Sequence, residues 1–276
     1  MTQAQVHPGA GGAALAARAG LVAVVVDALR ASGTLATLLA HGAERVLVVA
    51  EPAEAFALRD ALLTSAGDLR PEHILLVGER GGLMVPGCDR GNEPVVGNEV
   101  IPPLAIFTSS NCARCCLAAR SAPAMLLGHT INATAAATVA SALAADLGTA
   151  IMLVPAGFAD DETRLNLEDT LACGCLMDRG GLSPANDAAL AALYAYRHVG
   201  PEGLARQFAL GAHGRHLLDL GRGDDLRYLA QVDVLDLVPV RVGVAELGGV
   251  TYVELAARRA SIQSEMAPAA TRNTTA

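Results

Sequence analysis

The sequence of 276 residues contains no lysine and no tryptophan, because all 20 residues counted as Lys or Arg are arginine. Schiff-base enzymes, pyridoxal-phosphate enzymes and Walker-type nucleotidases each need the ε-ammonium group of a lysine, which arginine cannot replace. The absence of lysine therefore excludes these three classes. Any anion that the protein handles must be held by arginine side chains, by backbone amides or by a metal ion.

Positive charge is also scarce. The chain has 28 acidic residues against 20 arginines and no basic run, which argues against nucleic acid as a partner and favours a small molecule. The first twenty residues lack the cationic start and apolar block of a signal peptide, and charges interrupt the hydrophobic stretch that follows. We therefore expect a cytoplasmic protein without a membrane partner. Its six cysteines are then expected to be reduced thiols, most of them buried.

Strand-like and helix-like segments alternate between residues 14 and 260. Short β-branched runs stand at residues 21–26, 45–49, 73–77, 104–108, 124–127, 150–154 and 238–242. Segments of helical length lie at residues 33–40, 52–63, 111–119, 132–147, 167–177, 184–196, 201–210 and 212–220. This alternation predicts a single α/β domain with a mostly parallel or mixed sheet covered on both faces. Residues 1–13 and 261–276 show no periodicity, and we expect both ends to be disordered.

The order of elements repeats at an offset near 80 residues. Residues of about 20–100 and 101–243 each contain a strand, a helix, a strand, a helix and a strand in that order. An internal duplication would give two such similar halves. Independent αβ units would give the same pattern by chance, so both interpretations stay open.

Polar residues gather where four of the strand patterns end, which is where open α/β sheets bind ligands. In the first cluster, Asp27 follows a buried run and Arg30 comes three residues later, so a metal ligand and an anion-binding fork would share one strand tip. Asp27 could equally cap the next helix, with Arg30 as its surface ion pair. The second cluster spans residues 78–94, where five glycines and two prolines surround six charged or amide side chains. Such a loop is typical of a binding site, and its amides could face a phosphate or sulfonate.

The other two clusters follow later strands. Residues 108–114 place hydroxyl and amide side chains at the start of a helix, where they either bind an anion or form a plain helix cap. The fourth cluster, after residues 155–157, contains several acids that could bind Mg²⁺. Residues 160–162 could also form a solvated turn, and Glu168 and Asp169 could simply stabilise the dipole of the helix they begin.

Two further arrangements are weaker. The cysteines at residues 112–116 and 173–175 could form a structural zinc site, but their spacing is irregular and no histidine stands at ligand spacing. His213 and His216 lie one turn apart on an expected helix, where a solvated pair is the simpler interpretation.

Taken in order along the chain, these clusters resemble the motifs of the 2-phosphosulfolactate phosphatase family. The resemblance spans about residues 20–243, including a late segment at residues 214–215 and the strand at residues 238–240. It rests on Asp27-Ala-Leu-Arg30-Ala-Ser, Gly78-Glu-Arg-Gly-Gly82, Gly87-Cys-Asp-Arg-Gly91-Asn-Glu-Pro94, Thr108-Ser-Ser-Asn111 with Arg114, Asn132-Ala, and Leu167-Glu168-Asp169.

The resemblance implies a three-layer α/β/α fold and a Mg²⁺-dependent acid phosphatase that converts 2-phosphosulfolactate to sulfolactate and phosphate. Family members of this kind serve coenzyme M biosynthesis or other sulfonate metabolism. On this hypothesis the metal ligands come from Asp27, Glu79, Glu168 and Asp169, and the catalytic residues are Asp27, Glu79 and Arg80. The small anionic substrate would contact Arg30, Gly81, Gly82, Asp89, Asn92, Thr108, Ser109, Ser110, Asn111, Arg114 and Asn132.

Within that hypothesis, three arginines have a defined task. Arg30, Arg80 and Arg114 would hold the phosphate, carboxylate and sulfonate groups of one small substrate, because a planar guanidinium can bind an oxyanion through two hydrogen bonds. Whether Asp27 acts as metal ligand, base or nucleophile stays open. The alanine-rich segment at residues 132–147 could pack against a second subunit or against the sheet, so a homo-oligomer is also left open.

One motif departs from the family. Where its members usually have Thr-Asn-Gly-Thr-Arg, this chain has Ser110-Asn111-Cys112-Ala113-Arg114. If that glycine adopts a left-handed backbone or lets phosphate approach closely, the thiol of Cys112 would reshape the pocket. The alternative function is therefore a non-catalytic binding protein or sensor for a small phosphorylated acid.

Overall fold

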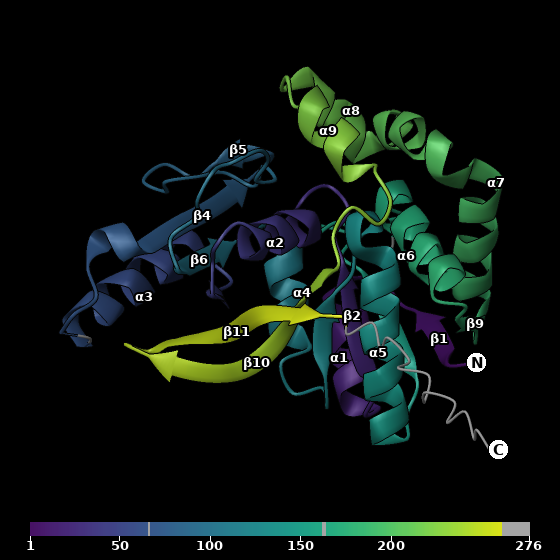
Figure 1. Ribbon diagram of the computed structural model, residues 1–276, viewed down its shortest axis with the longest axis horizontal. Coiled ribbons are helices and arrows are strands. Elements are labelled where there is room, and N and C mark those ends of the chain that lie inside the picture. The colour runs from purple at the N-terminus through teal and green to yellow at the C-terminus, as the bar shows by residue number, and fades with distance from the viewer. Residues whose placement is uncertain (66, 162–163, 261–276) are drawn as a thin grey trace, which may run out of the picture.

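The structure is a computed structural model that describes residues 1–65, 67–161 and 164–260 (Figure 1). Two of the sequence-based expectations, the disorder of residues 261–276 and the solvated position of Glu162, lie outside the described residues.

The described residues form one mixed sheet of eleven strands with nine α-helices around it. The strands are β1 (Gln3–Val6), β2 (Val22–Val26), β3 (Arg45–Val48), β4 (Ile74–Arg80), β5 (Leu83–Met84), β6 (Leu104–Thr108), β7 (Met125–Leu127), β8 (Ile151–Pro155), β9 (Ser183–Pro184), β10 (Leu237–Leu247) and β11 (Val250–Arg259). The helices are α1 (Gly9–Arg18), α2 (Ala31–Ala40), α3 (Pro52–Ser65), α4 (Cys112–Ala118), α5 (Ala133–Leu147), α6 (Leu167–Arg179), α7 (Asp187–Leu210), α8 (Ala212–Asp219) and α9 (Gly223–Leu229).

The sheet consists of two parallel groups joined by a hairpin, with the short strand β5 antiparallel to β4 at one edge. Its strand order is β5-β4-β6-β3-β11-β10-β7-β2-β8-β1-β9. Strands β4, β6 and β3 run parallel to one another, as do β7, β2, β8, β1 and β9. The antiparallel hairpin β10–β11 pairs with β7 on one side and with β3 on the other. The expected mixed α/β sheet is therefore confirmed.

The strand order has an internal symmetry that bears on the two expected halves. Strand β2 from the first half lies between β7 and β8 of the second, and β6 from the second half lies between β3 and β4 of the first. Within the eight strands from β4 to β8 of this order, exchanging β2 for β6, β3 for β7, β4 for β8 and β10 for β11 reproduces the order read from the other end. The two halves of the sequence therefore interdigitate in one sheet and are not separate lobes.

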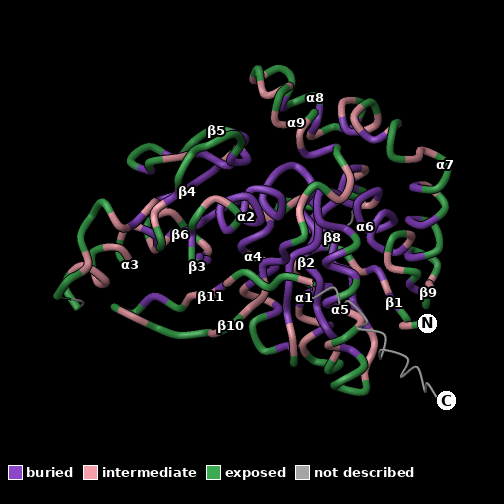
Figure 2. Tube along the Cα trace, in the orientation of Figure 1, coloured by how far each residue is buried: buried purple, intermediate pink, exposed green. Residues whose placement is uncertain are grey.

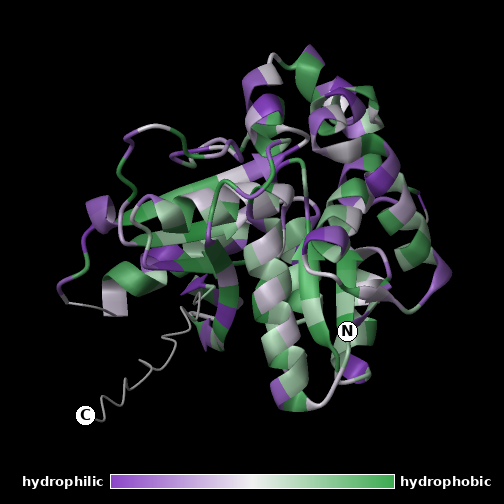
Figure 3. Cartoon of the chain, turned by 45° about the vertical axis from the view of Figure 1, so that its right-hand side comes forward, coloured by the Kyte–Doolittle hydropathy of each residue, from purple (hydrophilic) through white to green (hydrophobic). Residues whose placement is uncertain are grey.

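Successive side chains of each strand point to opposite faces of the sheet, and this divides the core into layers. In β2, Val22, Val24 and Val26 pack in a hydrophobic cluster with α5, α6 and α7, whereas Ala23 and Val25 pack with α1, α2 and α4 on the other face. A third cluster places α3 against β3, β4 and β6. Figure 2 shows the central strands β2 and β8 buried between these helices, and Figure 3 shows the hydrophobic character of the sheet. The arrangement is the expected three-layer α/β/α fold.

Several segments differ from the sequence-based expectations, among them the short strands β5 and β9, which were not expected. Another is the N-terminus, where expected disorder gives way to β1, which pairs with β8 from Ala4 to Val6, and to the start of α1. Sequence pattern missed β1 because only four residues form it and its partner lies about 150 residues away in the chain. Strand β11 and helix α9 are also unexpected. The two helices expected at residues 184–196 and 201–210 form one element, α7, with a kink at Gly200 (φ 67°) before Pro201.

This fold brings the ends of several strands to one place. The residues at the carboxyl ends of β2, β4, β6 and β8 line a common cavity, although β4 and β6 belong to one parallel group and β2 and β8 to the other. Helix α8 contributes the opposite wall of the cavity, and Figure 1 shows α8 and α9 together at that end of the molecule. No helix among the described residues combines the length and apolar character needed to cross a membrane.

Candidate active site

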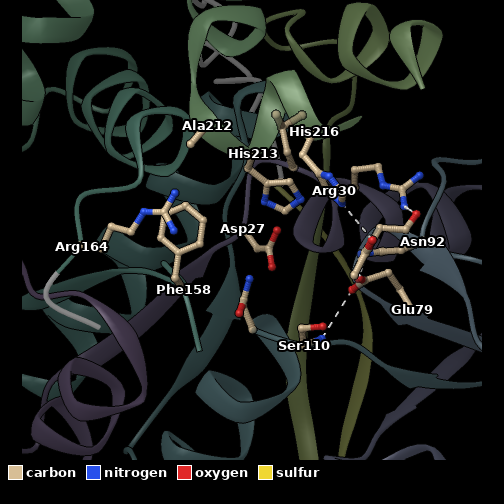
Figure 4. A pocket seen from close by; sticks show the side chains of 14 residues that line it. Asp27, Arg30, Glu79, Asn92, Ser110, Phe158, Arg164, Ala212, His213 and His216 are labelled. Carbon is tan, nitrogen blue, oxygen red and sulfur yellow. Dashed lines mark hydrogen bonds between the residues drawn. The ribbon is translucent and has the colours of Figure 1, made fainter. Parts of the chain in front are cut away.

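The cavity at the strand ends has a volume of about 280 Å³ (Figure 4). It is the meeting point of four loops and one helix, and it contains acids, arginines, amides and two histidines. Its lining consists of Asp27, Leu29, Arg30, Glu79, Gly81, Gly82, Asn92, Ser110, Asn111, Phe158, Arg164, Ala212, His213 and His216. Eight of these fourteen residues are candidates from the sequence, so its strand-end clusters do meet in space.

Asp27 stands at the tip of β2, where the chain turns into α2. Its Oδ1 accepts a hydrogen bond from the amide of Ala31 at 3.2 Å. The hydroxyl of Ser32 accepts a hydrogen bond from the amide of Asp27 and donates one to its carbonyl, which stabilises the turn. The pKa of Asp27 is raised to about 6, mainly by burial and in part by the nearby Glu79 carboxylate, against the opposing effects of the Ala31 amide and Arg30. A buried acid with a repelling neighbour is a group that a bound cation would stabilise.

Glu79 is held by the glycine-rich loop that follows β4. Its Oε1 accepts a hydrogen bond from the amide of Gly82 at 2.6 Å, and its Oε2 lies 3.5 Å from the amide of Ser110. The loop makes this possible because Gly81 and Gly82 have φ values of 61° and 81°, which residues with a Cβ rarely adopt. The glycine-rich sequence therefore builds a tight turn that aims one carboxylate at the cavity.

Arg30 is almost fully buried and is fixed at both ends of its guanidinium. Nη1 donates to Oδ2 of Asp225 on α9 at 2.6 Å, and Nη2 donates to the carbonyl of Gly82 at 2.9 Å. The side chain thus ties the β2–α2 turn to the β4 loop and to α9. It also places a positive charge beside Asp27 and Glu79, where it can hold an anion.

Glu168 and His213 form a second polar layer on one side of the cavity. Glu168 is 1% exposed, its Oε1 has no hydrogen-bond partner, and it lies 3.8 Å from Nδ1 of His213 on α8. Burial raises the pKa of Glu168 to about 7, and the charge of Asp27 contributes in the same direction. Burial together with the charges of Arg30, His216 and Arg164 lowers the pKa of His213 to about 4. Near neutral pH the histidine is uncharged, and the carboxyl behind it can hold a proton.

Asp169 and His129 form hydrogen bonds to the backbone of Ala28, the residue after Asp27. The two carboxylate oxygens of Asp169 accept hydrogen bonds from the amides of Ala28 at 2.7 Å and Gly157 at 3.0 Å, which joins the ends of β2 and β8. The ring of His129 donates from Nε2 to the carbonyl of Ala28 at 2.9 Å, and burial lowers its pKa to about 4. Asp169, which the sequence offered as a metal ligand, therefore lies behind the cavity and orients its lining.

Two of the three arginines proposed as anion ligands do not line the cavity. The Arg80 guanidinium donates to the carbonyls of Ala50 and Glu79 and to the hydroxyl of Thr108. Arg114 donates to the carbonyl of Ala159 at 2.8 Å. Both side chains stand at strand ends as expected, but nearby acceptors direct them away from the cavity.

Four other substrate-binding candidates also have structural contacts outside the lining. Asn132 accepts a hydrogen bond from the amide of His129 and donates to the carbonyl of Leu237. Asp89 accepts from the amide of Leu76, and Ser109 accepts from the amide of Ala113. Thr108 donates to the carbonyl of Ala50. These four residues hold neighbouring backbone segments together, and none of them lines the cavity.

Six residues of the lining were not among the sequence candidates. These are Leu29, Phe158, Arg164, Ala212, His213 and His216. The solvated position expected for His213 and His216 is wrong for His213, which is half-buried. His216 is exposed as expected, although it also lines the cavity and its ring lies 3.0 Å from the carbonyl of Gly81. The spacing of the two histidines, three residues apart on one helix, was the available signal. Nothing in the local sequence shows that this helix covers strand ends far away in the chain.

The side chain of Cys112, where the chain departs from the family motif, lies outside the cavity lining. All six cysteines are free and buried, as expected. Cys112 starts α4, is fully buried, and has its Sγ 4.0 Å from that of Cys116. Asp233 is the one non-glycine residue of the described chain with a positive φ, so Cys112 has no left-handed backbone. The thiol therefore replaces a glycine without strain and points into the core.

The lining fits a magnesium ion better than a metal bound entirely by protein. Within the described residues no three His, Cys, Asp or Glu side chains are placed to hold an ion, and this includes the cysteines considered for a zinc site. Magnesium usually takes one or two carboxylates and completes its six ligands with water and substrate oxygens. Asp27 and Glu79 supply such a pair.

The chain has clear relatives. Residues 13–243 match the model of a family described as 2-phosphosulpholactate phosphatase. A protein of Carboxydothermus hydrogenoformans named probable 2-phosphosulfolactate phosphatase is 33% identical over 220 residues, which cover 78% of this chain and 84% of the relative. A protein of the same name from Symbiobacterium thermophilum is 33% identical over 228 residues, which cover 80% of this chain and 91% of the relative. Another protein of that name, from Synechococcus, is 36% identical over 231 residues, which cover 80% of this chain and 88% of the relative.

Proposed function

The chain belongs to the 2-phosphosulfolactate phosphatase family, and on that premise we propose that it hydrolyses the phosphate ester of 2-phosphosulfolactate to give sulfolactate and inorganic phosphate. The reaction is that of a phosphoric monoester hydrolase. The observation that carries the proposal is the cavity at the strand ends, where two carboxylates and a buried arginine meet within a space suited to one small, highly charged molecule. The residues with these roles are Asp27, Glu79 and Arg30.

Different residues of the chain have different roles in the proposed reaction. Arg30 holds a phosphoryl oxygen through its in-plane N–H groups and balances the charge that builds up there. The hydroxyl of Ser110 lies at the same end of the cavity as a further donor. Helix α8 covers the site from the opposite side and limits the access of water. Burial raises the pKa of Glu168 to about 7, so its carboxyl can hold a proton, and Nδ1 of His213 lies 3.8 Å from its Oε1. Because His213 lines the cavity, the pair can protonate the oxygen that leaves with sulfolactate.

Magnesium is the proposed cofactor. Asp27 and Glu79 would hold it, and a bound Mg²⁺ would polarise the phosphoryl oxygens and lower the pKa of a coordinated water. The support for this assignment is the excess of buried negative charge. The charge of Glu79 raises the pKa of Asp27, and the charge of Asp27 in turn raises the pKa values of Glu168 and Asp169.

The direct test of function is phosphate release by protein freed of metal with a chelator. We expect no turnover of 2-phosphosulfolactate until Mg²⁺ is restored, and slower turnover of a generic phosphomonoester that lacks the carboxylate and sulfonate. Phosphate release that is unaffected by the chelator would contradict the metal assignment. Tight binding of 2-phosphosulfolactate without any turnover would instead identify the chain as a binding protein or sensor.

A second prediction concerns the departure from the family motif. Because Cys112 and Ala113 are fully buried outside the cavity lining, restoring the family residues with Cys112→Gly and Ala113→Thr should leave the rate of phosphate release unchanged. The test is to compare the steady-state rates of phosphate release by the double variant and by the parent protein. A large gain in rate would mean that these two residues restrain catalysis, and would favour the sensor interpretation of the parent chain.

A further inference from the structure

The cavity has two distinct ends, each with one arginine. Figure 4 shows Glu79, Asn92 and Arg30 on one side of Asp27, and Phe158 and Arg164 on the other. The first end holds the carboxylate pair and is the place of phosphoryl chemistry in the proposed function. The second end has no such pair among the lining residues, which suggests that it binds a part of the substrate that does not react.

Arg164 differs from the other arginines near the site in the freedom of its donors. Arg30 is engaged by Asp225 and the carbonyl of Gly82, and Arg80 and Arg114 donate to acceptors away from the cavity. Within the described parts of the chain, the Arg164 guanidinium has no ion pair and no hydrogen bond, although its charge acts on both Glu168 and His213. Among the described residues, Arg164 is therefore the lining arginine whose donors are uncommitted.

Phe158 fixes the orientation of that cation. The guanidinium carbon of Arg164 lies 3.9 Å from the centre of the Phe158 ring, so the planar group stacks on the aromatic face. The ring of Phe158 in turn contacts that of His213, with 6.5 Å between the ring centres. Stacking covers one face of the guanidinium and leaves the N–H groups of its edge free for an oxyanion. A stacked arginine is also more weakly hydrated than a lysine, which suits a weakly hydrated anion such as a sulfonate.

The covalent structure of the substrate decides which anion reaches this end. The carboxylate of 2-phosphosulfolactate is attached to the carbon that bears the phosphate ester. The sulfonate is attached one carbon further away, on the methylene group. When the phosphoryl group lies at Asp27 and Glu79, the sulfonate is the anion that can extend furthest across the cavity.

We propose that Arg164, stacked on Phe158, is the sulfonate-binding residue of this site and sets its preference for sulfonated phosphate esters. The inference rests on the proposed function, because it takes the carboxylate pair as the position of the phosphoryl group. It assigns a specificity role to a residue on the β8–α6 connection, away from the phosphoryl end.

The experiment compares two substrates that differ in the sulfonate alone, 2-phosphosulfolactate and 2-phospholactate. Arg164→Met should lower kcat/KM for 2-phosphosulfolactate by about 10- to 100-fold, because a charge-assisted contact is lost, and should leave that for 2-phospholactate nearly unchanged. Phe158→Leu should give a smaller loss with the same selectivity. Arg206→Met, which removes an exposed arginine of α7 outside the lining, is the matched control and should change neither substrate.

Three outcomes would overturn the proposal. Equal losses on both substrates would assign Arg164 to the carboxylate or to the fold, and thermal unfolding of the variant would separate these two. No loss on either would remove Arg164 from substrate binding. If the parent protein turns over neither ester, calorimetric titration of sulfolactate still decides. Binding that weakens in Arg164→Met supports the sulfonate site although the phosphatase proposal has failed, and binding unchanged by the substitution overturns both.

Discussion

Asp27→Asn should abolish phosphate release while making the metal-free protein more stable. The carboxamide oxygen of the substituted side chain can still accept the hydrogen bond from the amide of Ala31, so the turn should persist, but the negative charge at the phosphoryl end would be gone. We expect kcat to fall by at least about a hundredfold, the lower range for losing a positioned catalytic group. Loss of activity together with a gain in stability is the signature of a residue kept for function at a cost to folding.

The stability gain follows from the pKa of Asp27, which burial raises to about 6 from an ordinary value near 4. The folded protein therefore binds this proton more tightly than the unfolded chain does. Asp27 does not affect stability below the pKa that it has in the unfolded chain. Stability is lost as the pH rises through 6, and the loss reaches about 3 kcal/mol at pH 7 for a pKa shift of about two units. In chelator, Asp27→Asn should thus unfold at a higher denaturant concentration than the parent at about pH 7.5, and at the same one near pH 4.

Magnesium should reverse that ranking. A divalent cation that binds the folded parent stabilises it, whereas the variant lacks a ligand and should gain little. Denaturant unfolding with and without Mg²⁺ at about pH 7.5 makes the comparison. An Asp27→Asn protein that is less stable than the parent in chelator would mean that the ionised carboxylate is stabilised by its surroundings, contrary to our description of the site.

The second large effect is expected for Arg30→Met, which should impair both folding and catalysis. Arg30 is 2% exposed and Asp225 16% exposed, so removal of the guanidinium leaves the Asp225 carboxylate without its partner in a partly buried position. Breaking a buried pair in this way costs about 3 kcal/mol. The variant also loses the positive charge at the phosphoryl end, and we expect kcat/KM to fall by about a hundredfold or more.

A double-mutant cycle separates these two contributions. Asp225→Asn combined with Arg30→Met removes the stranded charge, so the double variant should regain part of the stability but none of the activity. Arg179→Met is the control, because Arg179 pairs with Asp233 at the surface, where such pairs contribute about 1 kcal/mol or less. If the double variant regains activity as well, Arg30 acts only through the position of α9 and does not contact the substrate.

Much of this fold could be predicted from the sequence because its local patterns are strong. The run Val22–Val26 is apolar on both faces, which predicts a central strand and places Asp27 at its tip. The glycines of residues 78–94 likewise predicted a specialised loop, and it delivers Glu79, Gly81, Gly82 and Asn92 to the cavity. Such features are encoded within a few neighbouring residues, and so they can be inferred without knowledge of the partners.

The rest depends on contacts between distant segments. Arg80, Arg114 and Arg164 all stand near strand ends, and nothing local distinguishes them. Arg80 and Arg114 are directed away by carbonyls from other loops, whereas Arg164 finds a stacking partner in Phe158. Helix α8 reaches the cavity only because α7 bends and returns across the strand ends, which no periodicity reveals. Sequence thus located the acidic centre of the site but not its far end or its cover.

The most direct test of this account is a crystal structure of the protein with Mg²⁺, phosphate and sulfolactate bound. We predict a metal ion coordinated by Asp27 and Glu79, phosphate contacting Arg30, and the sulfonate within hydrogen-bond distance of the Arg164 guanidinium. Asp169 should keep its two backbone amides. A metal ion and anion bound among Thr108, Arg80 and Arg114 instead would contradict both the position of the active site and the division of the cavity into a reacting and a sulfonate-binding end.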